Sequence, residues 1–207
     1  MILKKLEVGP LGTNCYLLGC EKTRKGAVID PGGDVDLIKR EIETLGLEID
    51  YIINTHGHGD HILGNEELKE LTGASLLIHQ EDAGYLLDPR KNLTGWFGKA
   101  VQGLQPDRLL QEGDVISIGQ EITLTVIHTP GHTPGGICLD TGEDLFTGDT
   151  LFAGSIGRTD FPGGSYQTLI NSVRTKLFTL PGDRRIWPGH GPGSTLSYEK
   201  QTNPFFR

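Results

Sequence analysis

The stretch NTHGHGDH, from Asn54 to His61, places three histidines and one aspartate within six residues. The whole chain contains only seven histidines. Imidazoles and carboxylates crowded in this way are costly for a fold unless they bind a cation, carry protons or face solvent. The apolar run DYIIN predicts a strand over residues 50–54, so the histidines follow directly on its end. Loops at strand ends, held by a rigid sheet, commonly carry binding residues.

Three later motifs repeat this combination of a predicted strand, glycine and a metal-type side chain. They are TPGHTPG around His132, FTGD at Asp149 and PGHGPG around His190. A single histidine beside glycine is usually only a loop residue, whereas His-x-His-x-Asp-His as one unit is much more specific. His79 and His128 do not share this setting clearly, and we expect mainly structural roles for both.

The histidine loop offers more ligands than one metal ion needs. Zinc usually takes about four ligands, and a catalytic site keeps one position for water. Seven candidates therefore divide into two metal sites that share one carboxylate. The predicted ligands of the first site are His56, His58 and His132, those of the second are Asp60, His61 and His190, and the bridging ligand is Asp149. Two metals held in this way can share one nucleophile and clamp an oxyanion.

Composition limits the class of protein. The 207 residues are 36% hydrophobic and 22% charged, which fits one globular domain over residues 1–207. A formal net charge of −8 argues against a nucleic-acid partner, because such proteins usually carry a basic footprint. Nothing in the sequence specifies an oligomeric state.

The cysteines and the N-terminus bear on location. Cys15, Cys20 and Cys138 are odd in number and not spaced as a zinc pair, so we expect small buried side chains and a reducing compartment. The N-terminal residues lack the apolar core of a signal peptide, and no apolar run approaches the roughly 18–20 residues of a membrane span. A cytoplasmic protein without a membrane partner is the expectation.

Hydrophobic periodicity predicts two similar halves, each rich in strands and containing helices. The first half has strands over 2–8, 15–18, 27–30, 50–54 and 75–79, with helices over 35–45 and 62–71. The second has strands over 115–118, 122–128, 137–140, 144–150 and 185–187, with a helix over 166–178. Such halves suggest a two-sheet core covered by helices on both sides. Between them, Trp96 and Phe97 suggest either a lid or groove wall, or a surface loop that tucks in one aromatic pair.

The motifs THGHGDH, TPGHTPG, FTGDTLF and WPGHGPG, in this order, resemble the metallo-β-lactamase fold superfamily over nearly the whole chain. VIDPGG at Val28–Gly33 resembles its first motif, in which Asp30 would orient ligating histidines without binding metal. The resemblance implies an α+β fold, the four-layer αββα sandwich with two central mixed β-sheets. The metals would lie at one edge, between the sheets.

Within that superfamily the chain looks most like glyoxalase II, the hydroxyacylglutathione hydrolases, of the short bacterial type. The stretch LFAGSIGRTDFPGGS after Asp149 and the ending TNPFFR are typical of that group. The resemblance implies hydrolysis of S-D-lactoylglutathione, or another small thioester, by a metal-bound hydroxide. It implies two divalent ions, with zinc expected and iron or manganese compatible with the same ligands. Asp60 would also orient the hydroxide and pass on its proton.

One region of the longer glyoxalase II enzymes has no counterpart. Those enzymes grip glutathione with a C-terminal helical region, whereas only seventeen residues follow His190 here, so no separate helical domain is expected. The expected partner is therefore a small thioester, of which a glutathione conjugate is one option. Arg158 falls near the position of a basic glutathione contact. Alternatively, Arg158 pairs with Asp160 and stiffens the GRTD loop.

Other functions of the same fold compete with this interpretation. Persulfide dioxygenases have a GRTDF-like loop and hold one iron with ligands that correspond to His56, His132 and Asp149. The complete set for two metals, with PGHGPG around His190, favours the hydrolase. A secreted β-lactamase would need an export signal, and the acidic charge disfavours an RNA-processing nuclease. A metal-binding scaffold without catalysis is the remaining alternative, and loss of Asp60 or His61 would have been its sign.

Overall fold

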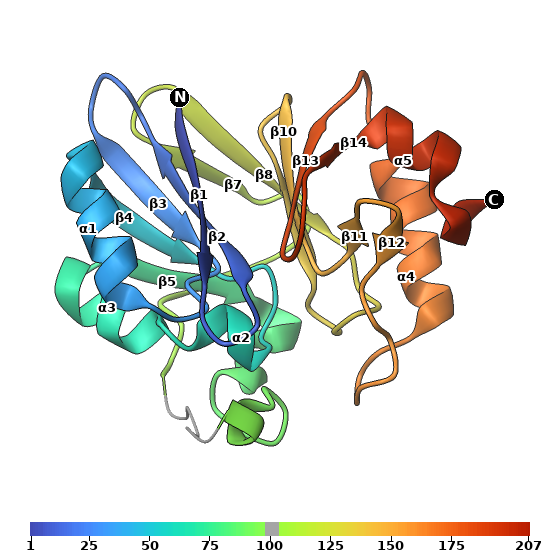
Figure 1. Cartoon of the computed structure of the whole chain (residues 1–207), viewed down its shortest axis with the longest axis horizontal. Coiled ribbons are helices and arrows are strands. Elements are labelled where there is room, and N and C mark those ends of the chain that lie inside the picture. The colour runs from blue at the N-terminus through green and yellow to red at the C-terminus, as the bar shows by residue number, and fades with distance from the viewer. Residues whose placement is uncertain (98–103) are drawn as a thin grey trace.

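The computed structural model of the chain describes residues 1–97 and 104–207 (Figure 1). The side chains of Trp96 and Phe97 lie outside the described part, so the prediction of a lid or groove wall there lies outside it too. Six strands build the first sheet, in the order β1-β2-β3-β4-β5-β6. They are β1 (Ile2–Val8), β2 (Thr13–Gly19), β3 (Lys25–Ile29), β4 (Glu48–Ile53), β5 (Ser75–His79) and β6 (Arg108–Leu110). The pairs from β1 to β3 are antiparallel and those from β3 to β6 are parallel.

The second sheet is also six-stranded, in the order β14-β13-β10-β9-β8-β7. Its strands are β7 (Val115–Ile118), β8 (Ile122–His128), β9 (Ile137–Asp140), β10 (Asp144–Gly148), β13 (Arg185–Pro188) and β14 (Ser194–Thr195). Strands β10 and β13 run parallel and the other pairs are antiparallel, so both sheets are mixed. A small hairpin of β11 (Leu151–Phe152) and β12 (Ser155–Ile156) stands apart.

Helices cover the outer face of each sheet, as Figure 1 shows. The α-helices are α1 (Val35–Leu45), α2 (Gly59–Ile62), α3 (Asn65–Thr72), α4 (Tyr166–Ser172) and α5 (Leu196–Thr202). The other helical elements are the 3₁₀ turns η1 (Gln80–Tyr85), η2 (Thr94–Phe97) and η4 (Pro204–Phe206) and the π-helical turn η3 (Val173–Leu177). The expected αββα sandwich with two central mixed sheets is confirmed.

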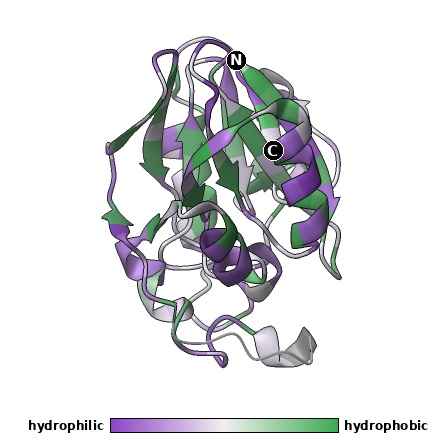
Figure 2. Cartoon of the chain, turned by 90° about the vertical axis from the view of Figure 1, so that its left-hand side faces the viewer, coloured by the Kyte–Doolittle hydropathy of each residue, from purple (hydrophilic) through white to green (hydrophobic). Residues whose placement is uncertain are grey.

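Alternation along β2 shows how one strand serves two layers. Successive side chains of a strand point to opposite faces. Tyr16 and Leu18 therefore pack between the sheets, with Phe146 of the second sheet, while Leu17 packs outward with Ile38 of α1. Both faces of β2 are buried, which explains why its residues 15–18 form a continuous apolar run without polar alternation. Figure 2 shows the hydrophobic strands inside and hydrophilic helix surfaces outside.

One predicted helix, over residues 62–71, is wrong in its extent. The structure has two helices there, α2 and α3, because the helix is interrupted at Gly64. The N–H of Gly64 donates to the carbonyl oxygen of Pro31 at 2.8 Å. A β-carbon on Gly64 would lie 2.7 Å from that same oxygen, so this close approach requires glycine. The predicted helix over 35–45 is confirmed as α1, and it ends at Gly46 with a positive φ of 62°.

We expect the Gly64→Ala variant to unfold at lower denaturant concentration, with a loss of about 1–3 kcal/mol, because the methyl group overpacks a backbone contact. Chemical denaturation followed by circular dichroism measures the loss. Gly84→Ala is the matched control, since a β-carbon there would meet only Lys91 Nζ, at 3.5 Å. Equal midpoints for the two variants would contradict the explanation of the break.

The parallel strands bring loops from distant parts of the sequence to one edge. Strands β3, β4 and β5 end at the edge where α2 lies (Figure 1). Strands β10 and β13 are also parallel to each other, so the loops that follow them leave the second sheet together. All three cysteines are free and buried, as expected. Among the described residues, no helix is long and apolar enough to cross a bilayer.

Candidate metal centre

All seven predicted ligands lie in loops or short helices that follow strands. His56 and His58 follow β4, and Asp60 and His61 lie in α2. The others follow strands of the second sheet: His132 follows β8, Asp149 follows β10 and His190 follows β13. The fold brings these seven together, although 134 residues separate the first from the last in sequence. Their donor atoms form overlapping groups of three within 4.8 Å: His56, His58 and His132; His56, His61 and Asp149; Asp60, His61 and His190.

The first of these groups, which we call the three-histidine group, is the tightest. It consists of His56, His58 and His132. His132 Nε2 lies 2.8 Å from His58 Nδ1 and 3.2 Å from His56 Nε2. Three imidazole nitrogens that converge in this way form one face of a tetrahedral site, and the fourth position is left for another ligand or for water.

The remaining residues form what we call the carboxylate group, Asp60, His61 and His190. Asp60 Oδ2 lies 3.0 Å from His190 Nε2 and 3.5 Å from His61 Nε2. Asp149 faces both groups, because its Oδ1 lies 3.4 Å from His61 Nε2 and its Oδ2 lies 3.6 Å from His132 Nε2. Asp149 thus lies between the two groups, within 4 Å of histidines from both.

Asp30 orients two of the histidines. One of its oxygens, Oδ2, accepts from His61 Nδ1 at 2.9 Å and from the Thr55 hydroxyl at 2.6 Å. Since the Thr55 hydroxyl donates to Asp30, its oxygen accepts from His56 Nδ1, at 3.2 Å. Both imidazoles therefore hold a proton on Nδ1 and direct Nε2 at the cluster. This arrangement fixes the tautomer a metal ligand needs.

The backbone of the GRTD loop orients a third histidine. His132 Nδ1 donates to the carbonyl oxygen of Arg158 at 2.7 Å, which leaves Nε2 unprotonated and directed at the three-histidine group. Thr55 and this carbonyl were not predicted as site residues. Thr55 could have been suspected from its place beside His56, but a contact between residues 132 and 158 has no signal in the sequence.

Two buried atoms at the centre test whether a cation fits. His61 Nε2 and Asp149 Oδ1 are buried and make no hydrogen bond with any residue that the structure describes. A buried polar atom without a partner costs about 1–3 kcal/mol, so native folds rarely leave one unsatisfied. A divalent cation between an imidazole lone pair and a carboxylate would satisfy both atoms. The donor set of imidazoles and carboxylates also suits zinc, iron or manganese.

The electrostatics of the cluster keep His56, His58 and Asp149 in the protonation states that bind a metal. Burial, reinforced by the neighbouring histidines, lowers the pKa of His56 well below its usual value and that of His58 to about 3. Both rings are therefore neutral at pH 7. Burial alone would raise the pKa of Asp149, but the charge of His61 and its contact with the carboxylate hold it below the ordinary value. Asp149 is thus an ionised acceptor.

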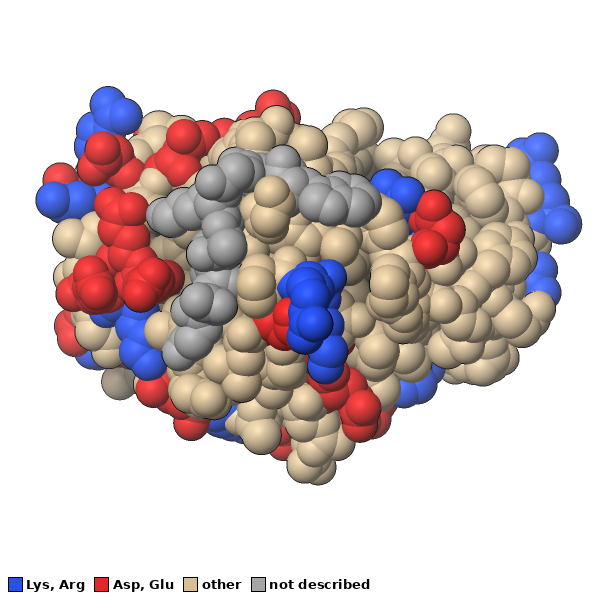
Figure 3. Space-filling model, turned by 90° about the horizontal axis from the view of Figure 1, so that it is seen from below, with Lys and Arg blue, Asp and Glu red and all other residues tan. Residues whose placement is uncertain are grey.

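A hollow of about 720 Å³ opens above the cluster. Its floor holds five of the predicted ligands: His58, Asp60, His132, Asp149 and His190. Its walls are largely apolar and include Leu11, Leu93, Phe152 and Phe161. On this edge of the molecule, viewed from below in Figure 3, acidic and basic side chains are intermingled over the described surface, with no broad basic area. The space suits a small, partly apolar molecule.

Arg158 lines this hollow as well. Its Nε and Nη2 donate to the two carboxylate oxygens of Asp160, each at 2.8 Å. Its guanidinium also lies 3.6 Å from the ring centroid of Phe161. The pairing with Asp160, one of the two roles considered for Arg158, is therefore present in the structure, and substrate contact stays a prediction.

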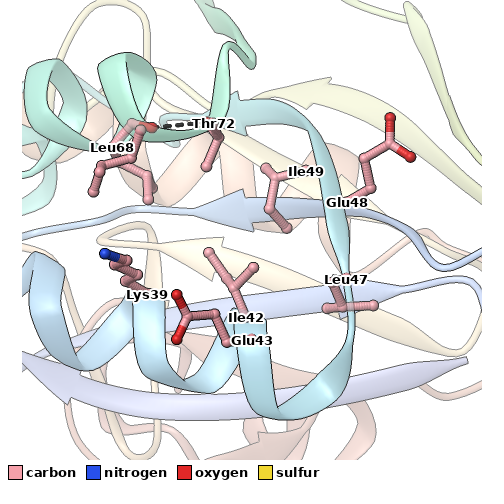
Figure 4. Close-up of a pocket in the computed structure, with 9 residues that line it drawn as sticks. Lys39, Ile42, Glu43, Leu47, Glu48, Ile49, Leu68 and Thr72 are labelled. Atoms are coloured by element: carbon pink, nitrogen blue, oxygen red, sulfur yellow. Dashed lines mark hydrogen bonds between the residues drawn. The ribbon is translucent and has the colours of Figure 1, made fainter.

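A second hollow, of about 250 Å³, lies on the outer face near α1 and α3 (Figure 4). Its lining includes the apolar side chains of Ile42, Leu47 and Ile49 and the charged side chains of Lys39 and Glu43. None of its described lining residues is a histidine, a cysteine or an aspartate. The larger hollow above the cluster is therefore the candidate active site.

His79 and His128 lie outside the cluster and stack on each other, with ring centroids 4.0 Å apart and planes 18° apart. Burial, helped by the charge of His128, lowers the pKa of His79 to about 4, from an ordinary value of 6.5. The unfolded chain therefore binds a proton between pH 6.5 and 4 that the folded chain does not bind. The stability linked to His79 is fully present above pH 6.5 and is lost as the pH falls toward 4.

We expect the unfolding free energy of the His79→Asn variant to fall less steeply than that of the unaltered chain between pH 6.5 and 4. The difference in slope against pH should be at most that produced by the binding of one proton on unfolding. Asparagine keeps an oxygen that can accept from the N–H of Glu81, as His79 Nδ1 does at 3.3 Å. Urea titrations at a series of pH values on metal-free protein measure the slope. A slope equal to that of the unaltered protein would show that His79 titrates normally in the fold.

A two-sheet sandwich that gathers seven imidazole and carboxylate donors at one edge defines a protein of the metallo-hydrolase type. The chain belongs to the metallo-beta-lactamase superfamily, whose family model matches residues 8–190. Among curated relatives, the hydroxyacylglutathione hydrolase GloC of Haemophilus influenzae is 38% identical over 209 residues, covering 99% of this chain and 98% of that protein. The family resemblance stated from the motifs is thereby confirmed.

Solved structures agree on the fold. The crystal structure of the BLEG-1 B3 metallo-beta-lactamase has a TM-score of 0.93 and 32% identity, covering 99% of each chain. That of TTHA1623 in a di-iron-bound form has a TM-score of 0.84 and 34% identity, covering 98% of this chain and 99% of the other. That of ETHE1 from Myxococcus xanthus has a TM-score of 0.82 and 32% identity, covering 99% of this chain and 84% of the other.

Proposed function

We propose that the protein is a dinuclear metal-dependent hydrolase of the glyoxalase II type, which cleaves a small thioester such as S-D-lactoylglutathione. The observation that carries the proposal is the position of Asp149, whose two oxygens face the three-histidine group and the carboxylate group. The 38% identity to a hydroxyacylglutathione hydrolase supports the thioester as substrate. Zinc is the proposed metal, with iron as the alternative, because a similar structure holds two irons.

The seven donors would be shared between two ions. The three-histidine group would hold one, the carboxylate group the other, and Asp149 would bridge them. When bound, such ions lower the pKa of a coordinated water to about 7 and polarise a carbonyl oxygen. The chain must then supply the substrate's position and a route for the proton.

Asp60 is the proposed catalytic residue. Burial would raise the pKa of its carboxyl, but the charge of His61 and the hydrogen bond from His190 lower it overall. Asp60 is therefore ionised at neutral pH, and it already accepts from the Thr13 hydroxyl at 3.4 Å. An ionised carboxylate at the floor of the hollow can orient the attacking water and accept its proton.

The walls of the hollow suit the two ends of a thioester differently. The carbonyl would lie on the floor, near Asp60 and Asp149, and the thiol portion would extend along Phe152 and Phe161. Arg158 is the proposed contact for a carboxylate of a glutathione moiety. Asp160 occupies its Nε and Nη2, so Nη1 is the atom that would meet the substrate.

A thioester assay tests this function. Hydrolysis of S-D-lactoylglutathione, followed by loss of the thioester's ultraviolet absorbance, should cease after dialysis against a chelator and return when zinc or iron is added back. Undiminished hydrolysis by the metal-free protein would contradict the proposal. Absence of hydrolysis by protein carrying two metals would show that another substrate is used.

A persulfide dioxygenase remains the second candidate, and one observation favours it. The three ligands that such an enzyme would use, His56, His132 and Asp149, also lie close enough for one ion, with His132 Nε2 at 3.2 Å from His56 Nε2 and 3.6 Å from Asp149 Oδ2. One iron per chain and oxygen uptake with glutathione persulfide would establish this alternative. Two metals and no oxygen uptake would exclude it.

A further inference from the structure

A buried carboxylate outside the predicted ligand set joins the two loops that carry the three-histidine group. Asp82 lies in η1, directly after β5, and its side chain is fully buried. Its Oδ2 accepts from the N–H of Gly57 at 2.9 Å and from the Thr133 hydroxyl at 2.7 Å. Its Oδ1 accepts from the N–H of Gly135 at 2.6 Å. All three donors come from the ligand loops.

The donors to Asp82 are next to predicted metal ligands in the sequence. Gly57 is the residue between His56 and His58, and Thr133 is the residue after His132. One loop leaves the first sheet and the other leaves the second, so Asp82 spans the boundary between the sheets. His58 Nδ1 and His132 Nε2, which lie 2.8 Å apart, belong to the two loops that Asp82 holds together.

Close packing reinforces the connection. A β-carbon on Gly57 would lie 2.3 Å from the β-carbon of Tyr85, and one on Gly135 would lie 2.5 Å from the backbone nitrogen of Asp82. Both glycines thus let their loops rest directly against η1. The short helical turn η1 thus acts as a common support for the two loops.

Asp30 does not orient all three histidines of the three-histidine group. It orients His61 directly and His56 through Thr55. His58 and His132 receive no contact from Asp30 in the described structure. The Arg158 carbonyl orients the ring of His132, whereas Asp82 joins the two loops that carry His58 and His132.

We propose that Asp82 is a positioning residue that sets the spacing of the three-histidine group and thereby the affinity of that group for its metal. It touches neither metal nor substrate, and it acts through the backbone of Gly57 and Gly135 and the hydroxyl of Thr133. This inference rests on the proposed metal binding by the three-histidine group. It goes further because it makes one of the two metal affinities depend on a residue that is not a ligand.

The Asp82→Asn variant is the sharpest test. An ionised carboxylate accepts at both oxygens, whereas an amide places an NH₂ group against one of three donors. Removing a partner that supports metal ligands typically lowers metal affinity about 10–100-fold. We expect a loss of this size at the three-histidine group and an unchanged affinity at the carboxylate group.

A matched control separates positioning from general stability. Glu199 is also fully buried, and it accepts from the N–H of Gly154, from Ser194 Oγ and from Asn203 Nδ2. Glu199→Gln makes the same chemical change in a buried acceptor of three hydrogen bonds that contacts neither loop of the three-histidine group. It should lower the unfolding free energy but leave both zinc affinities unchanged.

The Thr133→Val variant removes only one of the three donors to Asp82. It should weaken zinc binding at the three-histidine group about fivefold, and it provides a second test if Asp82→Asn does not fold.

The experiment is a titration of the metal-free full chain with Zn²⁺ against a competing chelator, with two readouts. One is the affinity of each binding step. The other is the ¹⁵N chemical shifts of the histidine rings, which report separately on His58 and His132 and on His61 and His190. The inference predicts that Asp82→Asn and Thr133→Val weaken only the step that shifts His58 and His132.

The outcomes are distinguishable. If the unaltered chain binds no zinc, the proposed function fails before Asp82 is tested. If the unaltered chain binds zinc and both variants bind it equally well, or if Glu199→Gln weakens the same step as much, the positioning role of Asp82 is wrong.

Discussion

The Asp149→Ala variant is expected to lose both metals and to hydrolyse thioesters at a rate reduced by more than roughly 10³-fold. Such a reduction is larger than that caused by removing a single group that stabilises the transition state. The reason is geometric. Asp149 Oδ1 lies 3.4 Å from His61 Nε2, and Oδ2 lies 3.6 Å from His132 Nε2 and 3.8 Å from His190 Nε2. One carboxylate thus faces histidines of both groups, and removing it leaves each group short of a ligand and of a negative charge.

Elemental analysis of the purified variant and the thioester assay together measure this result. Asp144→Asn is the control, because Asp144 is a buried carboxylate in the same strand region that accepts from Arg185 and Trp187 and lies outside the cluster. That control should be less stable yet keep its metals. Full metal content and turnover in Asp149→Ala would show that Asp149 does not bridge the two groups.

The Asp30→Ala variant should combine a loss of metal affinity with a loss of stability. Burial lowers the pKa of His61, but the charges of Asp60, Asp149 and Asp30 raise it well above the usual value overall, so without a metal the ring also holds a proton on Nε2, which a bound metal would replace. Asp30 and His61 then form a buried ion pair, with Oδ2 and Nδ1 2.9 Å apart. Removing one partner of such a pair costs about 3–5 kcal/mol. The same change frees the rings of His56 and His61 to rotate, and we expect about 10–100-fold weaker metal binding.

Denaturant titration of the metal-free chain gives the first quantity, and zinc competition on the folded chain gives the second. Asp50→Ala is the control, since its partly exposed pair with Lys25, at 3.1 Å, should contribute less than about 1 kcal/mol. A stability loss in Asp30→Ala no larger than that of Asp50→Ala would contradict the buried ion pair.

Short-range patterns predicted the strands and the ligand loops well. The strand predicted from DYIIN and the loop of histidines after it follow from neighbouring residues alone, because a strand end and a glycine-flanked histidine are features of consecutive residues. The same holds for α1, whose apolar spacing and terminal Gly46 lie within twelve residues. The elements without a prediction were short: β6, β11, β12, β14 and α5 have two to seven residues, too few for a periodic signal.

Long-range contacts account for what the sequence did not indicate. The break between α2 and α3 depends on Pro31, thirty-three residues before Gly64. The role of Asp82 has no signal in the sequence, since its partner Thr133 is fifty-one residues away. Only the paired sheets determine which of these distant residues meet. The seven candidate ligands, which the fold brings together, could therefore be picked out from their own motifs, while most of the residues that orient them could not.

The central claim is that two metals share one carboxylate, and the metal count of freshly purified protein tests it most directly. Elemental analysis should find about two zinc or iron ions per chain, and Asp149→Ala should hold close to none. About one iron per chain, unchanged when His190 is replaced by alanine, would contradict the claim and point to the single-metal dioxygenase.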